Sequence, residues 1–229
     1  MLQRNKAQGH RGVFSPFWER VFRPEGERLP NRAEREATKV RIGRVYDREG
    51  RWFVFGTPSH AVEEKLGFPL TDYILRQIGS NGFSEKHKFG VLELGCGTAE
   101  MAGHLKSRFG ENMRYVGQVL ERTKGMPYAG VDRLIEGEIR RLAPRENFDL
   151  IFSGESSALH HTLLKQTAVE KIMHWLKPGG LAVLDMGCTP DGGAYSNGIK
   201  TILLQNGIRD YTWNSFKLTF SKPAPRLPA

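Results

Sequence analysis

Cysteine is scarce in this chain. The two cysteines among its 229 residues, Cys96 and Cys188, stand alone, without the spacing of metal ligands or of a disulfide framework. Disulfide-rich scaffolds and thiolate-bound metal centres are therefore excluded, and a reducing cytoplasm is the expected compartment. Cys96 lies between two glycines, which we interpret as a requirement for a small residue rather than for a nucleophile.

Long hydrophobic runs are also missing. No apolar stretch approaches the ~20 residues that span a membrane, and no hydrophobic signal-peptide core follows Met1. We therefore expect neither export nor a membrane partner. Because the first eighteen residues contain basic but no acidic side chains, an organellar address stays open. A hydrophobic content of 39% over 229 residues is sufficient for one compact domain with an N-terminal extension.

Acidic residues are few near the N-terminus. Residues 1–56 hold thirteen basic and seven acidic side chains, a net charge of +6, and the other 21 basic and 18 acidic side chains give residues 57–229 a net charge of only +3. Arginines next to aromatic residues suit phosphate neutralisation and base stacking, so this segment is a candidate RNA contact. Alternatively, the aromatic residues form a core and the arginines lie on its solvated surface. The aromatic residues are Phe14, Phe17, Trp18, Phe22, Tyr46, Trp52, Phe53 and Phe55.

A short apolar segment that ends in a glycine turn is the most informative pattern. Residues 89–94 are apolar except for Glu93, and the turn Gly95-Cys96-Gly97 follows. Apolar residues then recur at helical spacing, which predicts a strand, a tight turn and a helix. Glycines in such a turn let a ligand approach backbone N–H groups. A dinucleotide fingerprint needs another glycine where Glu100 stands, so NAD and FAD are disfavoured.

A second pattern of strand, helix, turn and strand lies downstream. Residues 147–153 form a mostly apolar run, and a helical repeat through Ala168 and Trp175 follows. The segment Leu176-Lys-Pro-Gly-Gly180 then ends the helix before the apolar residues 181–184.

With these two patterns in this order, the sequence resembles the class I S-adenosylmethionine-dependent methyltransferases over roughly residues 85–222. Glu93, Gly95 and Gly97 match the family's Glu/Asp-x-Gly-x-Gly motif, and residues 176–180 match the turn before its fifth strand. The resemblance implies an α/β fold with a doubly wound, mostly parallel seven-stranded sheet. Ala99 replaces the family's usual third glycine, which is tolerable if its φ is negative.

The remaining elements can be placed around these patterns. Residues 115–121 and 133–137 are the expected second and third strands, and residues 197–206 are an expected helix. Residues 209–213 and 215–221 are expected to form an antiparallel pair at the edge of the sheet. We divide the chain into three parts, which are the extension (residues 1–84), the methyltransferase core (residues 85–222) and a tail (residues 223–229).

The extension is expected to contain several elements. Its first twelve residues have a disordered composition, residues 15–22 suit a short helix, and residues 39–46 and 51–55 suit a β-hairpin. Thr57-Pro58 begins a helix, and a second helix ends at Gly79. In the family that the sequence resembles, such segments commonly form a lid over the site. The alternative is a structural cap on the edge of the sheet.

The resemblance implies that S-adenosylmethionine binds across the carboxyl ends of the first strands. Gly95, Cys96 and Gly97 would then let the ligand contact their backbone N–H groups, and the Glu93 carboxylate would position the methionine ammonium group of the ligand. The family's acidic ribose ligand would fall at Val119, which has no polar group.

Other residues are candidates for the rest of the cofactor. Glu121 is the nearest carboxylate to the ribose position, and Gln118 is the nearest polar side chain. Glu138 matches the family's acid that reaches the adenine amino group, with Ile139 packing on the ring; a solvated loop acid is the alternative. Ser153 ends the fourth strand, at the point where catalytic or substrate residues of the family often lie.

Glu155, His160 and His161 follow the fourth strand and are candidate general bases. Methyl transfer from a sulfonium is an in-line displacement, so a base is needed only when the acceptor holds its proton. Alternatively, the histidines line the pocket wall. The sequence has no Asn/Asp-Pro-Pro-Tyr motif and no Pro-Cys pair, which disfavours methylation of adenine amino groups and of cytosine C5.

Three functions are consistent with these observations. The first is a methyltransferase for RNA or for a ribosome-associated protein, docked through the basic extension. The second is a methyltransferase for a small metabolite, with the extension as a lid. The third is a non-catalytic binding factor of the same fold, which is suggested by Val119 in place of the ribose ligand.

Overall fold

The computed structural model describes residues 59–81, 87–119, 122, 127–154, 159, 165–186, 194–214 and 216–224. The elements predicted for residues 1–55, the helix start at Thr57-Pro58 and the tail from residue 225 lie outside these ranges. Among the helices that the structure describes, none has the length and apolar character needed to cross a membrane.

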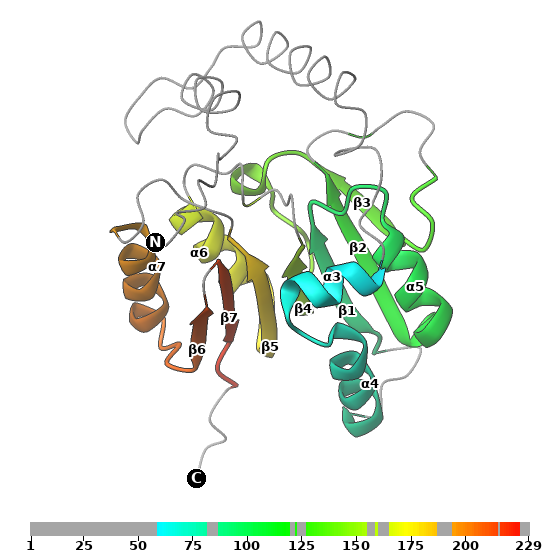
Figure 1. Cartoon of the computed structure of the whole chain (residues 1–229), viewed down its shortest axis with the longest axis horizontal. Coiled ribbons are helices and arrows are strands. Elements are labelled where there is room, and N and C mark those ends of the chain that lie inside the picture. Colours follow the sequence, from blue (N-terminus) through cyan, green and yellow to red (C-terminus); the bar gives the residue numbers. More distant parts are fainter. Residues whose placement is uncertain are drawn as a thin grey trace, which may run out of the picture. The chain divides into compact units, whose positions relative to one another are not determined.

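Seven strands form one sheet in the order β3-β2-β1-β4-β5-β7-β6 (Figure 1). Strands β1 to β5 are parallel, whereas β7 is antiparallel to both of its neighbours. The predicted doubly wound, mostly parallel seven-stranded sheet is therefore confirmed, together with the antiparallel pair at its edge. The strands are β1 (Phe89–Leu94), β2 (Met113–Val119), β3 (Arg133–Glu136), β4 (Phe148–Ser153), β5 (Leu176–Asp185), β6 (Tyr211–Asn214) and β7 (Lys217–Ser221).

Helices cover both faces of this sheet. Helices α3, α4 and α5 share one buried cluster with Val91 of β1, whereas α6 and α7 share another with Leu92 and Leu94. Because successive residues of a strand point to opposite faces, the two clusters lie on opposite faces. The helices are α3 (Ser59–Leu66), α4 (Leu70–Asn81), α5 (Glu100–Phe109), α6 (Lys165–Trp175) and α7 (Ala194–Gln205), with 3-10 turns η1 (Gly110–Asn112) and η2 (Ile139–Arg141).

Some elements have other bounds than the sequence predicts. Helix α4 passes through Gly79 instead of ending there. Strand β5 begins at Leu176, because this residue pairs with Phe148 of β4 before a register shift. The turn of residues 176–180 is thus an irregular first part of the strand. Gly180 is required in it, since an added Cβ would lie 3.0 Å from the Phe148 carbonyl oxygen.

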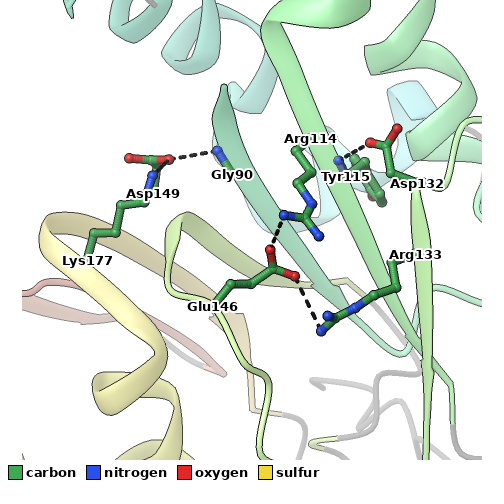
Figure 2. A network of polar contacts seen from close by, with 8 residues as sticks. All are labelled: Gly90, Arg114, Tyr115, Asp132, Arg133, Glu146, Asp149 and Lys177. Atoms are coloured by element: carbon green, nitrogen blue, oxygen red, sulfur yellow. Dashed lines mark hydrogen bonds and ion pairs between the residues drawn. The ribbon is translucent and has the colours of Figure 1, made fainter. Parts of the chain in front are cut away.

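Carboxylates connect the amino ends of the parallel strands (Figure 2). Asp149 of β4 accepts hydrogen bonds from the Gly90 N–H at 2.7 Å and from Lys177 Nζ at 2.6 Å. Asp132 accepts a hydrogen bond of 2.6 Å from the Tyr115 N–H. These acids satisfy strand backbone groups that would otherwise lack a partner.

Glu146 extends this network to the edge of the sheet. Its carboxylate lies 2.5 Å from Arg114 of β2 and 3.3 Å from Arg133 of β3 (Figure 2). The amino ends of β1 to β5 meet at one edge because the strands are parallel, so this network is structural and leaves the opposite edge for a ligand.

Candidate functional site

The carboxyl ends of the parallel strands meet at the edge opposite this network. β2 and β3 lie on one side of β1, and β4 and β5 lie on the other (Figure 1). At such a switch point the chain leaves a crevice in which α/β proteins bind ligands. The register places Leu94 beside Gln118 and Val119 beside Glu136, so the ends of β1, β2 and β3 lie level with one another.

The glycine turn has the backbone that the motif predicts. Gly95 has a φ of 72° and Gly97 a φ of 52°, both in the left-handed region that favours glycine. Helix α5 follows, and its N-cap residue Ala99 makes no side-chain capping hydrogen bond. The N–H groups of a first helical turn lack partners within the helix, and they favour a negative or polar ligand group.

Ala99 does not meet the condition under which alanine would be readily tolerated in this turn. Its φ is 61°, not negative, and its side chain is buried at the N-cap position of α5. A left-handed alanine costs roughly 1–2 kcal/mol. The turn therefore holds Ala99 in a left-handed conformation that glycine would adopt without this cost.

Glu93 is a buried carboxylate on the face of β1 that α3, α4 and α5 cover. Its Oε2 accepts a hydrogen bond of 2.5 Å from the Tyr115 hydroxyl. Burial raises the pKa of Glu93 to about 8, and the hydrogen bond from Tyr115 lowers it only in part. At neutral pH most of the free protein thus holds Glu93 protonated, and a cationic ligand group would favour its ionised form.

Cys96 is buried in the same region. Burial, followed by the nearby Glu93 carboxylate, raises the pKa of its thiol far above the ordinary value. An added Cβ at Gly117 would lie 2.7 Å from Cys96 Sγ, so the thiol fills the space that the glycine leaves on β2. These contacts agree with the interpretation of Cys96 as a small packing residue.

Gln118 is fully buried near the end of β2. Its Oε1 accepts a hydrogen bond of 2.9 Å from the Gly95 N–H, and its Nε2 donates one of 2.7 Å to the Gly137 carbonyl oxygen. Both ends of the amide are thus bonded to backbone.

The adenine candidates lie just after β3. Glu138 forms ion pairs with Arg140 and, at 3.9 Å, with Arg141. Ile139 is completely buried in the cluster that α6 and α7 share. In this state the Glu138 carboxylate has cationic neighbours, and the Ile139 side chain belongs to the core.

Ser153 ends β4 with an unsatisfied hydroxyl. The residue is fully buried, and its Oγ has no hydrogen-bond partner in the described structure. A buried hydroxyl without a partner is unfavourable by roughly 1–3 kcal/mol. A ligand with a polar group at this strand end would remove that penalty.

Four predicted residues lie outside the described part of the chain, so the structure places none of them. They are Glu121, Glu155, His160 and His161.

No motif in the sequence marks Tyr115 as a partner of Glu93. Side chains two residues apart on a strand point to the same face, so Tyr115 and Gly117 of β2 share a face. Gly117 pairs with Glu93 of β1, which brings the Tyr115 side chain near Glu93. The period of two along β2 becomes usable only when the register between β1 and β2 is known.

Together these features fit a ligand that has both polar and cationic groups. The turn of Gly95 and Gly97 and the uncapped start of α5 present backbone, Ser153 presents a free hydroxyl, and Glu93 presents a carboxyl that can ionise. S-adenosylmethionine carries an ammonium, a carboxylate and ribose hydroxyls, so it matches this donor and acceptor set.

Comparisons with known proteins identify a methyltransferase domain in the sequence and a similar fold among solved structures. Residues 92–184 match the family model described as a methyltransferase domain. The structure of DesVI from Streptomyces venezuelae aligns with a TM-score of 0.50 and 15% identity, covering 72% of this chain and 94% of that chain. A search of curated protein sequences found no match.

Two further solved structures are similar at lower TM-scores. CalS10 from Micromonospora echinaspora, an amino pentose methyltransferase solved with S-adenosylmethionine, aligns at 0.42 with 20% identity; the match covers 72% of this chain and 60% of that one. The N-methyltransferase NodS from Bradyrhizobium japonicum also aligns at 0.42, with 18% identity over 67% of this chain and 94% of that one.

The fold, the glycine turn and the family match define the class. Residues 92–184 match a methyltransferase domain, the sheet has the class I methyltransferase fold, and the cofactor of such domains is S-adenosylmethionine.

Proposed function

We propose that this domain binds S-adenosylmethionine along the carboxyl ends of β1 to β4. The observation that carries the proposal is the turn at Gly95 and Gly97, whose left-handed backbone leads into the uncapped α5. Glu93 would pair with the methionine ammonium group, and Ser153 would supply a hydroxyl. When bound, the cofactor supplies an electrophilic methyl group on its sulfonium.

Further residues complete the proposed cofactor site. We assign the ribose hydroxyls to Glu121 and the adenine amino group to Glu138. Packing of Ile139 on the ring would require its fully buried side chain to leave the core. Because Glu138 pairs with Arg140 in this structure, its contact to adenine requires the carboxylate to be shared or the arginine to move aside. Glu155, His160 and His161 are the candidates for accepting a proton from the methyl acceptor.

We expect S-adenosylhomocysteine to bind to the whole chain with a dissociation constant at the micromolar level, which corresponds to a binding free energy of about −8 kcal/mol. Isothermal titration calorimetry measures this directly. NAD is the control ligand, since Glu100 stands where a dinucleotide fingerprint needs glycine. Absence of S-adenosylhomocysteine binding under all conditions would favour the non-catalytic binding factor.

For the methyl acceptor we propose RNA or a ribosome-associated protein. The supporting observation is the charge distribution, with a net +6 on residues 1–56 against +3 on the rest. The arginines of this segment alternate with aromatic residues, which suits contact with phosphates and bases. A small metabolite acceptor is the competing hypothesis, in which the same segment would cover the site as a lid.

Salt dependence separates these two acceptors. With about four phosphates neutralised, RNA affinity should fall with salt at a log–log slope near −3 to −4. Replacing Arg41, Arg44 and Arg51 by glutamine should flatten this slope and leave S-adenosylhomocysteine binding unchanged. Fluorescence anisotropy with a labelled RNA provides the measurement, and Trp52→Ala tests the stacking component if its circular dichroism spectrum is unchanged. A slope near zero would favour the metabolite hypothesis.

A further inference from the structure

The side chain of Gln118 joins two loops that come from different strands. Its Oε1 accepts the 2.9 Å hydrogen bond from the Gly95 N–H, in the turn between β1 and α5. Its Nε2 donates the 2.7 Å hydrogen bond to the carbonyl oxygen of Gly137, in the loop after β3. β2 lies between β1 and β3 in the sheet, so one central side chain reaches both loops.

The backbone of β2 makes the same connection. The Cys96 N–H donates to the Gln118 carbonyl oxygen at 2.9 Å, and the Gly137 N–H donates to the Val119 carbonyl oxygen at 2.9 Å. Each loop is thus attached to the end of β2 by one backbone bond and by one end of the Gln118 amide.

Both loops have backbone conformations that need support. Gly95 has a φ of 72° and Gly137 a φ of 130°. Such conformations are open to glycine but are rarely held without surrounding contacts. The two hydrogen bonds to Gln118 are made by Gly95 and Gly137 themselves. Because glycine has no side chain to limit its φ and ψ, these bonds restrict each loop at its most flexible residue.

The chemistry of the two partners determines the orientation of the amide. A backbone N–H only donates and a carbonyl oxygen only accepts, so Oε1 must face Gly95 and Nε2 must face Gly137. Glutamine provides both functions at this length. A carboxylate would lack the donor, and an aliphatic side chain would lack both groups. Because Gln118 is fully buried, a lost bond is not replaced by water.

We propose that Gln118 is a positioning residue that holds two loops of the cofactor site at a fixed separation. They are the turn at Gly95, which would contact the methionine part of the cofactor, and the loop at Gly137, which would contact the adenine. Gln118 does so from a fully buried position, with both ends of its amide bonded to backbone groups of the loops. This role replaces its assignment as an alternative ribose ligand. The inference rests on the proposed cofactor site, since it needs the ligand to span both loops.

The experiment compares S-adenosylhomocysteine affinity of the whole chain and two variants. Gln118→Met preserves length but removes both hydrogen bonds, and we expect an affinity loss of about tenfold or more with the fold retained by circular dichroism. The second variant, Gln118→Glu, also adds a negative charge. Gln205→Glu, a substitution at an exposed position of α7, is the control for that charge.

Gln118→Glu tests the two-sided bond itself. A protonated carboxyl can accept from the Gly95 N–H and donate to the Gly137 carbonyl oxygen, whereas a carboxylate repels that oxygen. Its affinity, divided by that of the unchanged chain at each pH, should approach one at pH 5 and fall at least about tenfold by pH 9.5. Dividing by the unchanged chain removes any pH dependence that comes from Glu93.

The outcomes separate the inference from the proposed function. A ratio that stays constant with pH, at any level, overturns the inference, as does a Gln118→Met variant that binds normally. If Gln118→Met fails to fold, the pH series of Gln118→Glu still decides. Failure of the proposed function has a different signature, because the unchanged chain would then bind no S-adenosylhomocysteine.

Discussion

Replacing Gly97 by valine is expected to abolish cofactor binding, with a loss of at least about 100-fold, or about 2.7 kcal/mol, in S-adenosylhomocysteine affinity. Gly97 is exposed at the turn and has a φ of 52°. A branched side chain there would occupy the path along which the ligand reaches the backbone N–H groups, and it would also strain a left-handed backbone. Isothermal titration calorimetry gives the affinity.

Gly110→Val is the matched control for this substitution. Gly110 has nearly the same φ, 53°, and ends the same helix α5 at the far edge of the sheet. An added Cβ there has open space within 4 Å. The control should also lose stability from backbone strain but keep its affinity. Tight binding by Gly97→Val would move the cofactor site elsewhere, and equal losses of affinity in both variants would attribute the effect to strain.

Glu93→Gln is expected to stabilise the protein at pH 8 while it weakens cofactor binding. Burial raises the pKa of Glu93 from 4.5 to about 8, so between these values the folded state holds one proton more than the unfolded state. The contribution of Glu93 to stability should therefore be greatest below pH 4.5 and fall as the pH rises toward 8. Glutamine has no proton to release and avoids this loss, which is on the order of 3 kcal/mol.

Denaturant unfolding at pH 5 and pH 8 measures this difference. The stability advantage of Glu93→Gln should be small at pH 5 and large at pH 8, whereas Glu170→Gln, at an exposed position of α6, should show no comparable change. An equal effect of Glu93→Gln at both pH values would contradict a buried, protonated carboxyl.

The same residue predicts a pH dependence of binding. If the ionised Glu93 pairs with the ligand ammonium, affinity for S-adenosylhomocysteine should rise between pH 6 and pH 8 as the carboxyl of the free protein ionises. In Glu93→Gln this rise should disappear, and the affinity should stay low throughout. A rise that persists in the variant would assign the titration to another group.

Local patterns in the sequence were sufficient for the elements around the site. The apolar run of residues 89–94, the glycine turn and the helical repeat up to Gly110 predict β1, the turn and α5, and the structure confirms each of them. These signals lie within one element or its cap, where periodicity and glycine content act directly on the backbone. The resemblance to the methyltransferases depends on the same local motifs, which explains why it identifies the fold.

Backbone details within these motifs depended on more than the local sequence. An alanine favours negative φ, and that was the condition under which the sequence made Ala99 tolerable in place of glycine. In the folded protein the entry into α5 and the packing of the Ala99 side chain in the core hold it at 61° instead. Similarly, β5 begins five residues earlier than its apolar run because Leu176 pairs with Phe148 on the neighbouring strand.

The sequence by itself determined the strand, the glycine turn and the helix at the carboxyl edge of the sheet; only the tertiary structure decided which described side chains meet there. Tyr115 lies 22 residues from Glu93, and Gln118 lies 23 residues from Gly95 and 19 from Gly137. Hydrogen bonds at such separations depend on the register and the pleat of adjacent strands, which follow from the packing of both sheet faces. For the same reason, the burial that raises the pKa of Glu93 and leaves Ser153 without a partner arises only in the assembled sheet.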